Sequence, residues 1–141
     1  MFLGEYEYRI DKKGRVAIPA KLRKEFLDGL VITRGFDKCL LVYPKTEWDK
    51  FSARFEFSPI TPNKNRRLNR LIFSGAFSAE LDGQGRVALS PPLRQYAQID
   101  DMVVITGSNR YLEIWSKELW EQEKLLMEEE AWQLAEGIEL R

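Results

Sequence analysis

Apolar and polar residues alternate near the start of the chain and predict a first strand. Tyr6, Tyr8 and Ile10 would occupy one face of it, with charged residues between them on the other. Residues 11–14 then predict a turn, because aspartate bonds nearby backbone amides and Gly14 can take the positive φ of a tight hairpin. A short return strand would follow at residues 16–18.

The next segments alternate between short helical and extended patterns. A short helix after Pro19 would turn Leu22, Phe26 and Leu27 inward and end near residues 28–29. Strands are expected at residues 30–33 and 39–43, around a turn at 34–38. A helix over residues 45–55 would carry Trp48 and Phe51 inward.

The second half shows the same order of patterns. It predicts strands at residues 77–81, 87–89, 102–106 and 111–115, with a short helix after residues 90–92. A longer helix would begin at Ser116 as cap. Its inward side is expected to hold Leu119, Trp120, Leu126, Met127, Ala131 and Leu134, with glutamates facing solvent.

These parallels indicate an internal duplication. Residues 11–21 match residues 82–92 at an offset of 71, and the match resumes after an insertion at an offset of 72, where Gly35 pairs with Gly107. Each half of about fifty residues buries too little surface alone to form an independent domain, so the halves are expected to share one core.

The pattern predicts a mainly β protein with short helices, of the α+β class. Residues 1–54 would form the first half and residues 74–141 the second half with its extended C-terminal helix. Residues 55–73 would link them, through a proline-containing connector at 58–63 and a basic amphipathic helix at 64–73.

The charge balance of zero conceals a difference between the halves. Residues 1–70 hold 16 Lys and Arg against 9 Asp and Glu, whereas residues 71–141 hold 6 against 13. A neutral chain can therefore still present a basic side to a polyanion, unless folding mixes the charges evenly over the surface.

The residue types present limit the chemistry. Histidine is absent, which removes the usual general base and the commonest metal ligand, and no glycine-rich phosphate loop occurs. The lone Cys39 lies in an apolar run and is expected to be a buried, reduced thiol. No cofactor, no metal and no small-molecule substrate are expected, nor is a membrane segment, and the protein is expected in the cytoplasm.

The repeated Asp-x-x-Gly-Arg turn is the candidate site. Its first copy presents Asp11, Lys12, Lys13 and Arg15, and arginine can grip a phosphate or a guanine edge while the aspartate orients it. The alternative is an ion pair that only closes the turn, worth at most about 1 kcal/mol on an exposed surface.

The second copy of the turn keeps Asp82 and Arg86 but replaces the lysines by Gly83 and Gln84. Because a turn has no packing need for these polar residues, their recurrence favours binding, with more phosphate affinity expected from the first turn. A carboxylate enzyme using Asp11 and Asp82 is disfavoured, since an arginine four residues away would hold each aspartate ionised.

The order of strand, Asp-x-x-x-Arg turn, Val-x-Ile-Pro, short helix and two strands resembles the SpoVT/AbrB-like swapped-hairpin domain. With two such units, the opening residues 1–6 and the segments 70–76 and 85–87, the chain closely resembles the MraZ family of transcriptional regulators. The resemblance implies a barrel of interlaced hairpins, formed here as an intrachain pseudo-dimer.

The resemblance also implies a ring-like homo-oligomer at the nucleoid. It would bind double-stranded DNA sequence-specifically, upstream of the division and cell-wall operon that its own gene heads. The family's motif residues fall on Asp11, Arg15, Asp82 and Arg86; Lys12 and Lys13 are added from the charge argument. The alternative is an oligomeric scaffold that binds a protein partner without DNA specificity.

Overall fold

The computed structural model describes residues 1–55, 60 and 62–138, so Ser58, Pro59 and Thr61 of the predicted connector lie outside the described residues. Its elements are β1 (Glu5–Arg9), β2 (Arg15–Ala17), η1 (Ala20–Phe26), β3 (Leu30–Arg34), β4 (Leu40–Pro44), α1 (Lys45–Ser52), η2 (Ala53–Phe55), α2 (Asn63–Ser74), β5 (Phe77–Ala79), β6 (Arg86–Ala88), α3 (Pro91–Tyr96), β7 (Met102–Ser108), β8 (Tyr111–Ser116) and α4 (Lys117–Glu136). The predicted mixture of strands and short helices is confirmed.

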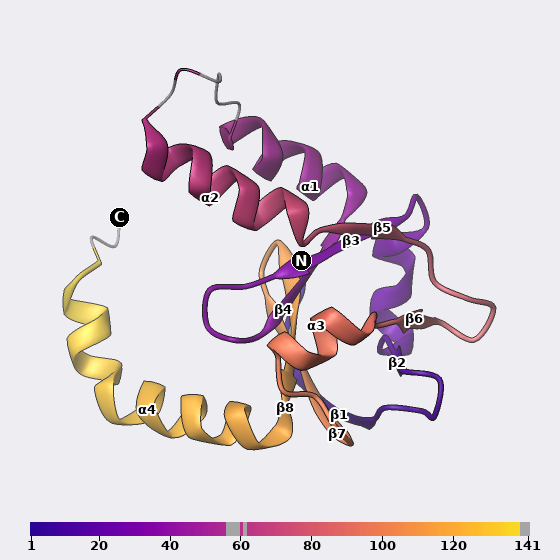
Figure 1. Ribbon diagram of the computed structural model, residues 1–141. Coiled ribbons are helices and arrows are strands. Elements are labelled where there is room, and N and C mark those ends of the chain that lie inside the picture. Colours follow the sequence, from indigo (N-terminus) through magenta and orange to yellow (C-terminus); the bar gives the residue numbers. More distant parts are fainter. Residues whose placement is uncertain (56–59, 61, 139–141) are drawn as a thin grey trace.

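The strands of the two halves are interleaved in one sheet. A six-stranded antiparallel sheet has the order β1-β7-β8-β4-β3-β5, so the first strand of each half pairs with a strand of the other (Figure 1). A separate two-stranded sheet joins β2 to β6. Every strand that follows a predicted turn is therefore paired across the halves.

The pairing registers reveal a local two-fold relation between the halves. In β2–β6, Val16 pairs with Val87, its own counterpart at an offset of 71. In β4–β8, Leu41 pairs with Glu113, its own counterpart at an offset of 72. A residue paired with its own copy lies on the symmetry axis, so this axis passes through both pairs.

One predicted equivalence between the halves, that of Gly35 with Gly107, is wrong. Tyr8 pairs with Val103 and its counterpart Ala79 pairs with Leu30, so β3 matches β7 at an offset of 73. The difference arises because the loop before β7 is longer than the one before β3, and the following turn is shorter. Gly107 therefore occupies the place of Arg34 rather than that of Gly35.

One hydrophobic core serves both halves, as predicted. It lies where β2 and β6 pack on the large sheet, and it includes Val16, Ile18, Val87 and Leu89 together with inward residues of β3, β4, β7 and β8. Leu22 and Phe26 of η1 enter this core, but Leu27 is 85% exposed because the helix ends before it could turn inward.

A second apolar layer holds α1 and α2 together outside the main core. The rings of Trp48 and Phe51 lie 5.6 Å and 5.1 Å from that of Tyr43, and Phe73 of α2 packs edge-on against Trp48. Both aromatics of α1 face inward as predicted, but neither is fully buried, because they cover the face of the sheet opposite the main core. The two helices project from the body as an arm (Figure 1).

Helix α4 departs from its predicted packing. Ser116 caps it through a bond from the Leu119 amide, 3.1 Å long, as expected. No side chain of α4 is buried, and Leu126 and Leu134 are 50% and 52% exposed. The helix runs past the edge of the sheet, and its distal half lies away from the rest of the described chain (Figure 1). No helix among the described residues is long and apolar enough to cross a membrane.

Candidate nucleic-acid interface

The turn between β1 and β2 is built around the carboxylate of Asp11. Its Oδ1 accepts from the amides of Lys13 and Arg15 at 2.9 Å each, and its Oδ2 accepts from Nε of Arg15 at 2.7 Å. The Gly14 amide donates to the Asp11 carbonyl at 3.0 Å, with Gly14 at φ 76°. One carboxylate thus closes the turn and fixes the arginine beside it.

The turn between β5 and β6 repeats this arrangement. Asp82 accepts from the amides of Gln84 and Arg86 and from Nε of Arg86, all at 2.9 Å, and Gly85 has φ 74°. The four motif residues expected from the family resemblance therefore occupy equivalent positions in equivalent turns. Lys12 and Lys13 are exposed at the tip of the first turn, where the second has Gly83 and Gln84.

Hydrogen bonds within the turns keep the carboxylates of both aspartates ionised. The backbone amide of Arg15 is the main cause that lowers the pKa of Asp11, and the amide of Arg86 does the same to the pKa of Asp82; the guanidinium groups add to both effects. Both carboxylates are therefore charged at neutral pH and suit an orienting role better than proton transfer.

The pairing of β2 with β6 brings the two turns together. Two backbone hydrogen bonds join the halves here. The Ile18 amide donates to the Gly85 carbonyl at 2.9 Å, and the Leu89 amide donates to the Gly14 carbonyl at 2.8 Å. The Arg86 guanidinium also lies 3.6 Å from Asp11, so one carboxylate serves both arginines. The site is thus a single surface made by both copies of the motif.

Two further arginines belong to this surface, and sequence reasoning did not assign them to it. Nε of Arg23 donates to the Ile18 carbonyl at 2.8 Å, and Nε of Arg94 donates to the Leu89 carbonyl at 3.1 Å. A Cβ on Gly85 would meet the Arg23 side chain, and one on Gly14 would meet that of Arg94. Each arginine therefore lies on the turn of the opposite half. The match of these two arginines at an offset of 71 could have indicated a shared role. Which turn each arginine contacts follows only from the pairing of β2 with β6.

The basic turns and the acidic helix occupy different sides of the molecule. In Figure 1 both turns project at the right, whereas α4 runs out at the lower left. The described part of α4 carries seven glutamates and two lysines. The cationic side chains of the turns are thus separated in space from the glutamates of α4, which favours approach of a polyanion to the turns.

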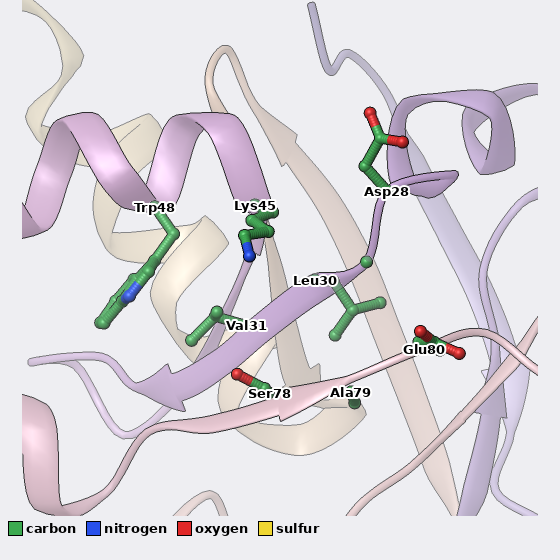
Figure 2. A pocket seen from close by; sticks show the side chains of 9 residues that line it. Asp28, Leu30, Val31, Lys45, Trp48, Ser78, Ala79 and Glu80 are labelled. Atoms are coloured by element: carbon green, nitrogen blue, oxygen red, sulfur yellow. The ribbon is translucent and has the colours of Figure 1, made fainter.

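A hollow of about 560 Å³ lies elsewhere, between α1 and strands β3 and β5 (Figure 2). Lys45 and Trp48 line it from α1, and Ser78 and Glu80 line it from around β5 (Figure 2). Among the described residues no side-chain hydrogen bond or ion pair joins these groups, so the hollow holds no paired base and nucleophile.

The thiol of Cys39 is buried, as predicted. It donates to Glu113 at 3.6 Å, and burial beside this carboxylate raises the pKa of the thiol far above its ordinary value. A protonated, buried thiol is a poor nucleophile. Within the described residues no cluster of carboxylates and thiols could hold a metal ion.

Comparison with known proteins identifies relatives over the whole chain. The profile of the family described as "MraZ protein, putative antitoxin-like" matches twice, at residues 1–71 and 72–134. A protein of Dehalococcoides mccartyi named transcriptional regulator MraZ is 45% identical over 140 residues, which cover 99% of each chain. One of Herpetosiphon aurantiacus with the same name is 50% identical over 138 residues, covering 98% of this chain and 96% of its own.

Proposed function

The chain belongs to the MraZ family, and on that basis we propose that it is a sequence-specific DNA-binding transcriptional regulator. It acts as a ring-like homo-oligomer on repeats upstream of its own division and cell-wall operon, in the cytoplasm at the nucleoid. The observation that carries the proposal is the joining of two equivalent Asp–Arg turns into one cationic surface by the β2–β6 pair.

The turns contact DNA through their arginines. In the described structure Arg15 meets its carboxylate through Nε, which leaves its terminal nitrogens for a phosphate or for the O6 and N7 acceptors of guanine. Asp11 and Asp82 orient the guanidinium groups and do not themselves contact the phosphates. Lys12 and Lys13 add phosphate contacts at the first turn only.

The architecture that presents the turns is an intrachain pseudo-dimer of two swapped-hairpin units. Residues 1–54 and 74–141 form these units, and residues 55–73 connect them. The strand exchange between halves and the residue pairs on the local two-fold axis support this arrangement.

Several weak contacts add up when chains assemble. A ring that presents several units to closely spaced repeats gains avidity of about 10² to 10⁴ over a single unit. A fragment with several direct repeats is therefore bound much more tightly than one with a single repeat.

The test is a salt titration of binding to the DNA upstream of the protein's own gene, beside a scrambled fragment. We expect the Arg15→Ala, Arg86→Ala variant to lose the preference for the native fragment. If both arginines contact phosphate, the log–log salt slope falls by about one unit for each lost contact; if they contact bases, discrimination falls by about 1–3 kcal/mol instead.

Arg110→Ala is the matched control. Arg110 is an exposed arginine in an ion pair with Glu47, at the β7–β8 turn, and its loss should leave DNA binding unchanged. Equal binding of native and scrambled DNA by the wild-type protein would contradict the proposal and favour a scaffold that contacts a protein partner.

A further inference from the structure

The distal half of α4 carries an apolar stripe and extends beyond the sheet (Figure 1). Along the proximal half, Lys117, Trp120 and Lys124 face the body, where they bond Glu7 and Glu5 of β1. The same helical spacing continues with Met127, Ala131 and Leu134. The side of the helix that faces the body along its proximal half therefore becomes apolar in its distal half.

Acidic side chains flank this stripe. Glu128 and Glu130 lie on either side of it, whereas Glu129 and Glu136 point to the opposite side of the helix by their spacing. From Leu125 to Glu136 the helix carries four glutamates and no basic residue. An apolar stripe with acidic edges is complementary to a surface that is apolar with basic edges.

Helix α2 offers such a surface on its outer side. Ile72 and Phe73 face the body, while Lys64, Arg67, Arg70 and Leu71 are exposed on the other side. Leu71 is 44% exposed, and no acidic residue occurs in the helix. Within the described part of the chain no carboxylate pairs with Lys64, Arg67 or Arg70, so their charge is available to a partner.

We propose that the distal half of α4 of one copy packs on the outer side of α2 of a second copy. This inference rests on the self-association in the proposed function and assigns its interface. Apolar contact joins the Met127–Leu134 stripe to Leu71, and Glu128 and Glu130 pair with Arg67 and Arg70. At about 1.5 Å per residue, the 20 residues of α4 extend roughly 30 Å, enough to reach a neighbouring molecule.

The contact is head-to-tail, because each copy offers α4 to one neighbour and α2 to the other. Such an interface repeats from copy to copy and closes into a ring when the rotation between neighbours allows it. It also leaves the turns outside the contact, since the arm and α4 lie away from them (Figure 1).

Charge reversal tests the pairing of these two surfaces. The Glu128→Lys, Glu130→Lys variant and the Arg67→Glu, Arg70→Glu variant should each weaken assembly roughly tenfold or more, as measured by light scattering across a dilution series. The chain with all four changes should regain assembly to within a few fold of the wild type, because every contact again joins opposite charges.

The Glu129→Lys, Glu136→Lys variant is the control, with the same change in charge on the opposite side of α4. It should assemble as the wild type does, and circular dichroism should show all variants folded. Assembly that withstands both reversals, or that the four changes fail to restore, would overturn this interface and leave the DNA proposal intact. A wild-type protein that stays monomeric would overturn the self-association itself.

Discussion

At the scale of single residues, the two aspartates of the turns have a double role. Each closes its hairpin through backbone amides and also holds a guanidinium through the other carboxylate oxygen. The ion pair that closes the turn and the oriented arginine that could bind DNA are therefore the same structure. An ion pair seen here does not argue against binding, because orientation of the arginine depends on it.

Gly85 should be far more sensitive to substitution than its neighbour Gly83. Gly85 has φ 74° and an added Cβ would meet the Arg23 side chain, whereas nothing lies within 4 Å of a Cβ on Gly83. We expect Gly85→Ala to lower the free energy of unfolding by about 1–2 kcal/mol, the cost of a left-handed backbone with a side chain. Equilibrium unfolding in urea measures this change in the free energy of unfolding. Gly83→Ala, the matched control, should change stability little, and equal effects would contradict this account.

The turns should make stability depend on acid pH. A carboxylate whose pKa is lower in the folded protein stabilises the fold above its unfolded value, near 3.8, and this contribution is lost as the pH falls through the folded pKa. Unfolding measured from pH 6 to pH 2 should therefore show a smaller loss of stability in the Asp11→Asn, Asp82→Asn variant than in the wild type. Parallel profiles for the two proteins would refute the assignment.

At the scale of elements, the three-residue strands β2 and β6 hold the site together. Val16 and Val87 pair on the local axis and are buried, with 0% and 1% exposure. Their sequence signal is weak, since each strand is short and follows a turn. The turn residues and the return strands could be predicted locally, but the pairing between halves depends on contacts distant in sequence.

Val16→Ala should weaken both turns at once. Deleting its buried methyl groups is expected to cost about 2 kcal/mol of stability. Because Val87 lies opposite, the double variant should differ from the sum of the single variants. Chemical denaturation of the two single variants and the double variant gives this coupling. Strict additivity would indicate that the two side chains do not interact.

The positions of the helices along the chain could be predicted from the sequence, but the exposure of their side chains could not. The pattern of α4 predicts the helix itself, yet periodicity does not reveal where the body beneath a helix ends. The match of Gly35 with Gly107 failed for a similar reason, because short loops gained and lost residues. Val31, Ile32 and Thr33 nevertheless keep positions in the strand ladders equivalent to those of Val104, Ile105 and Thr106.

At the scale of the whole molecule, the exchange of strands makes the two halves one structural unit. Strand β1 pairs with β7 of the other half, and β5 pairs with β3. A shared core of this kind cannot lose one half and keep the other. The sequence suggested this through the small size of each half, but only the sheet order shows how the sharing occurs.

Unfolding should accordingly be a single transition. Trp48 belongs to the first half and Trp115 to the second, and both are packed against other aromatic rings. Fluorescence of variants that retain one of these tryptophans, with the others changed to phenylalanine, should give the same midpoint as circular dichroism. Separate midpoints for the two reporters would show that the halves unfold independently.

The unequal tips of the two turns give the molecule a direction. A DNA-binding surface with perfect two-fold symmetry would bind its site equally well in either orientation. Lys12 and Lys13 stand opposite Gly83 and Gln84 across the local axis, so the tip of one turn carries two extra positive charges and the tip of the other carries none. Bound to DNA, such a surface would distinguish the upstream from the downstream side of its site, and successive copies would follow one another along the duplex in the same orientation.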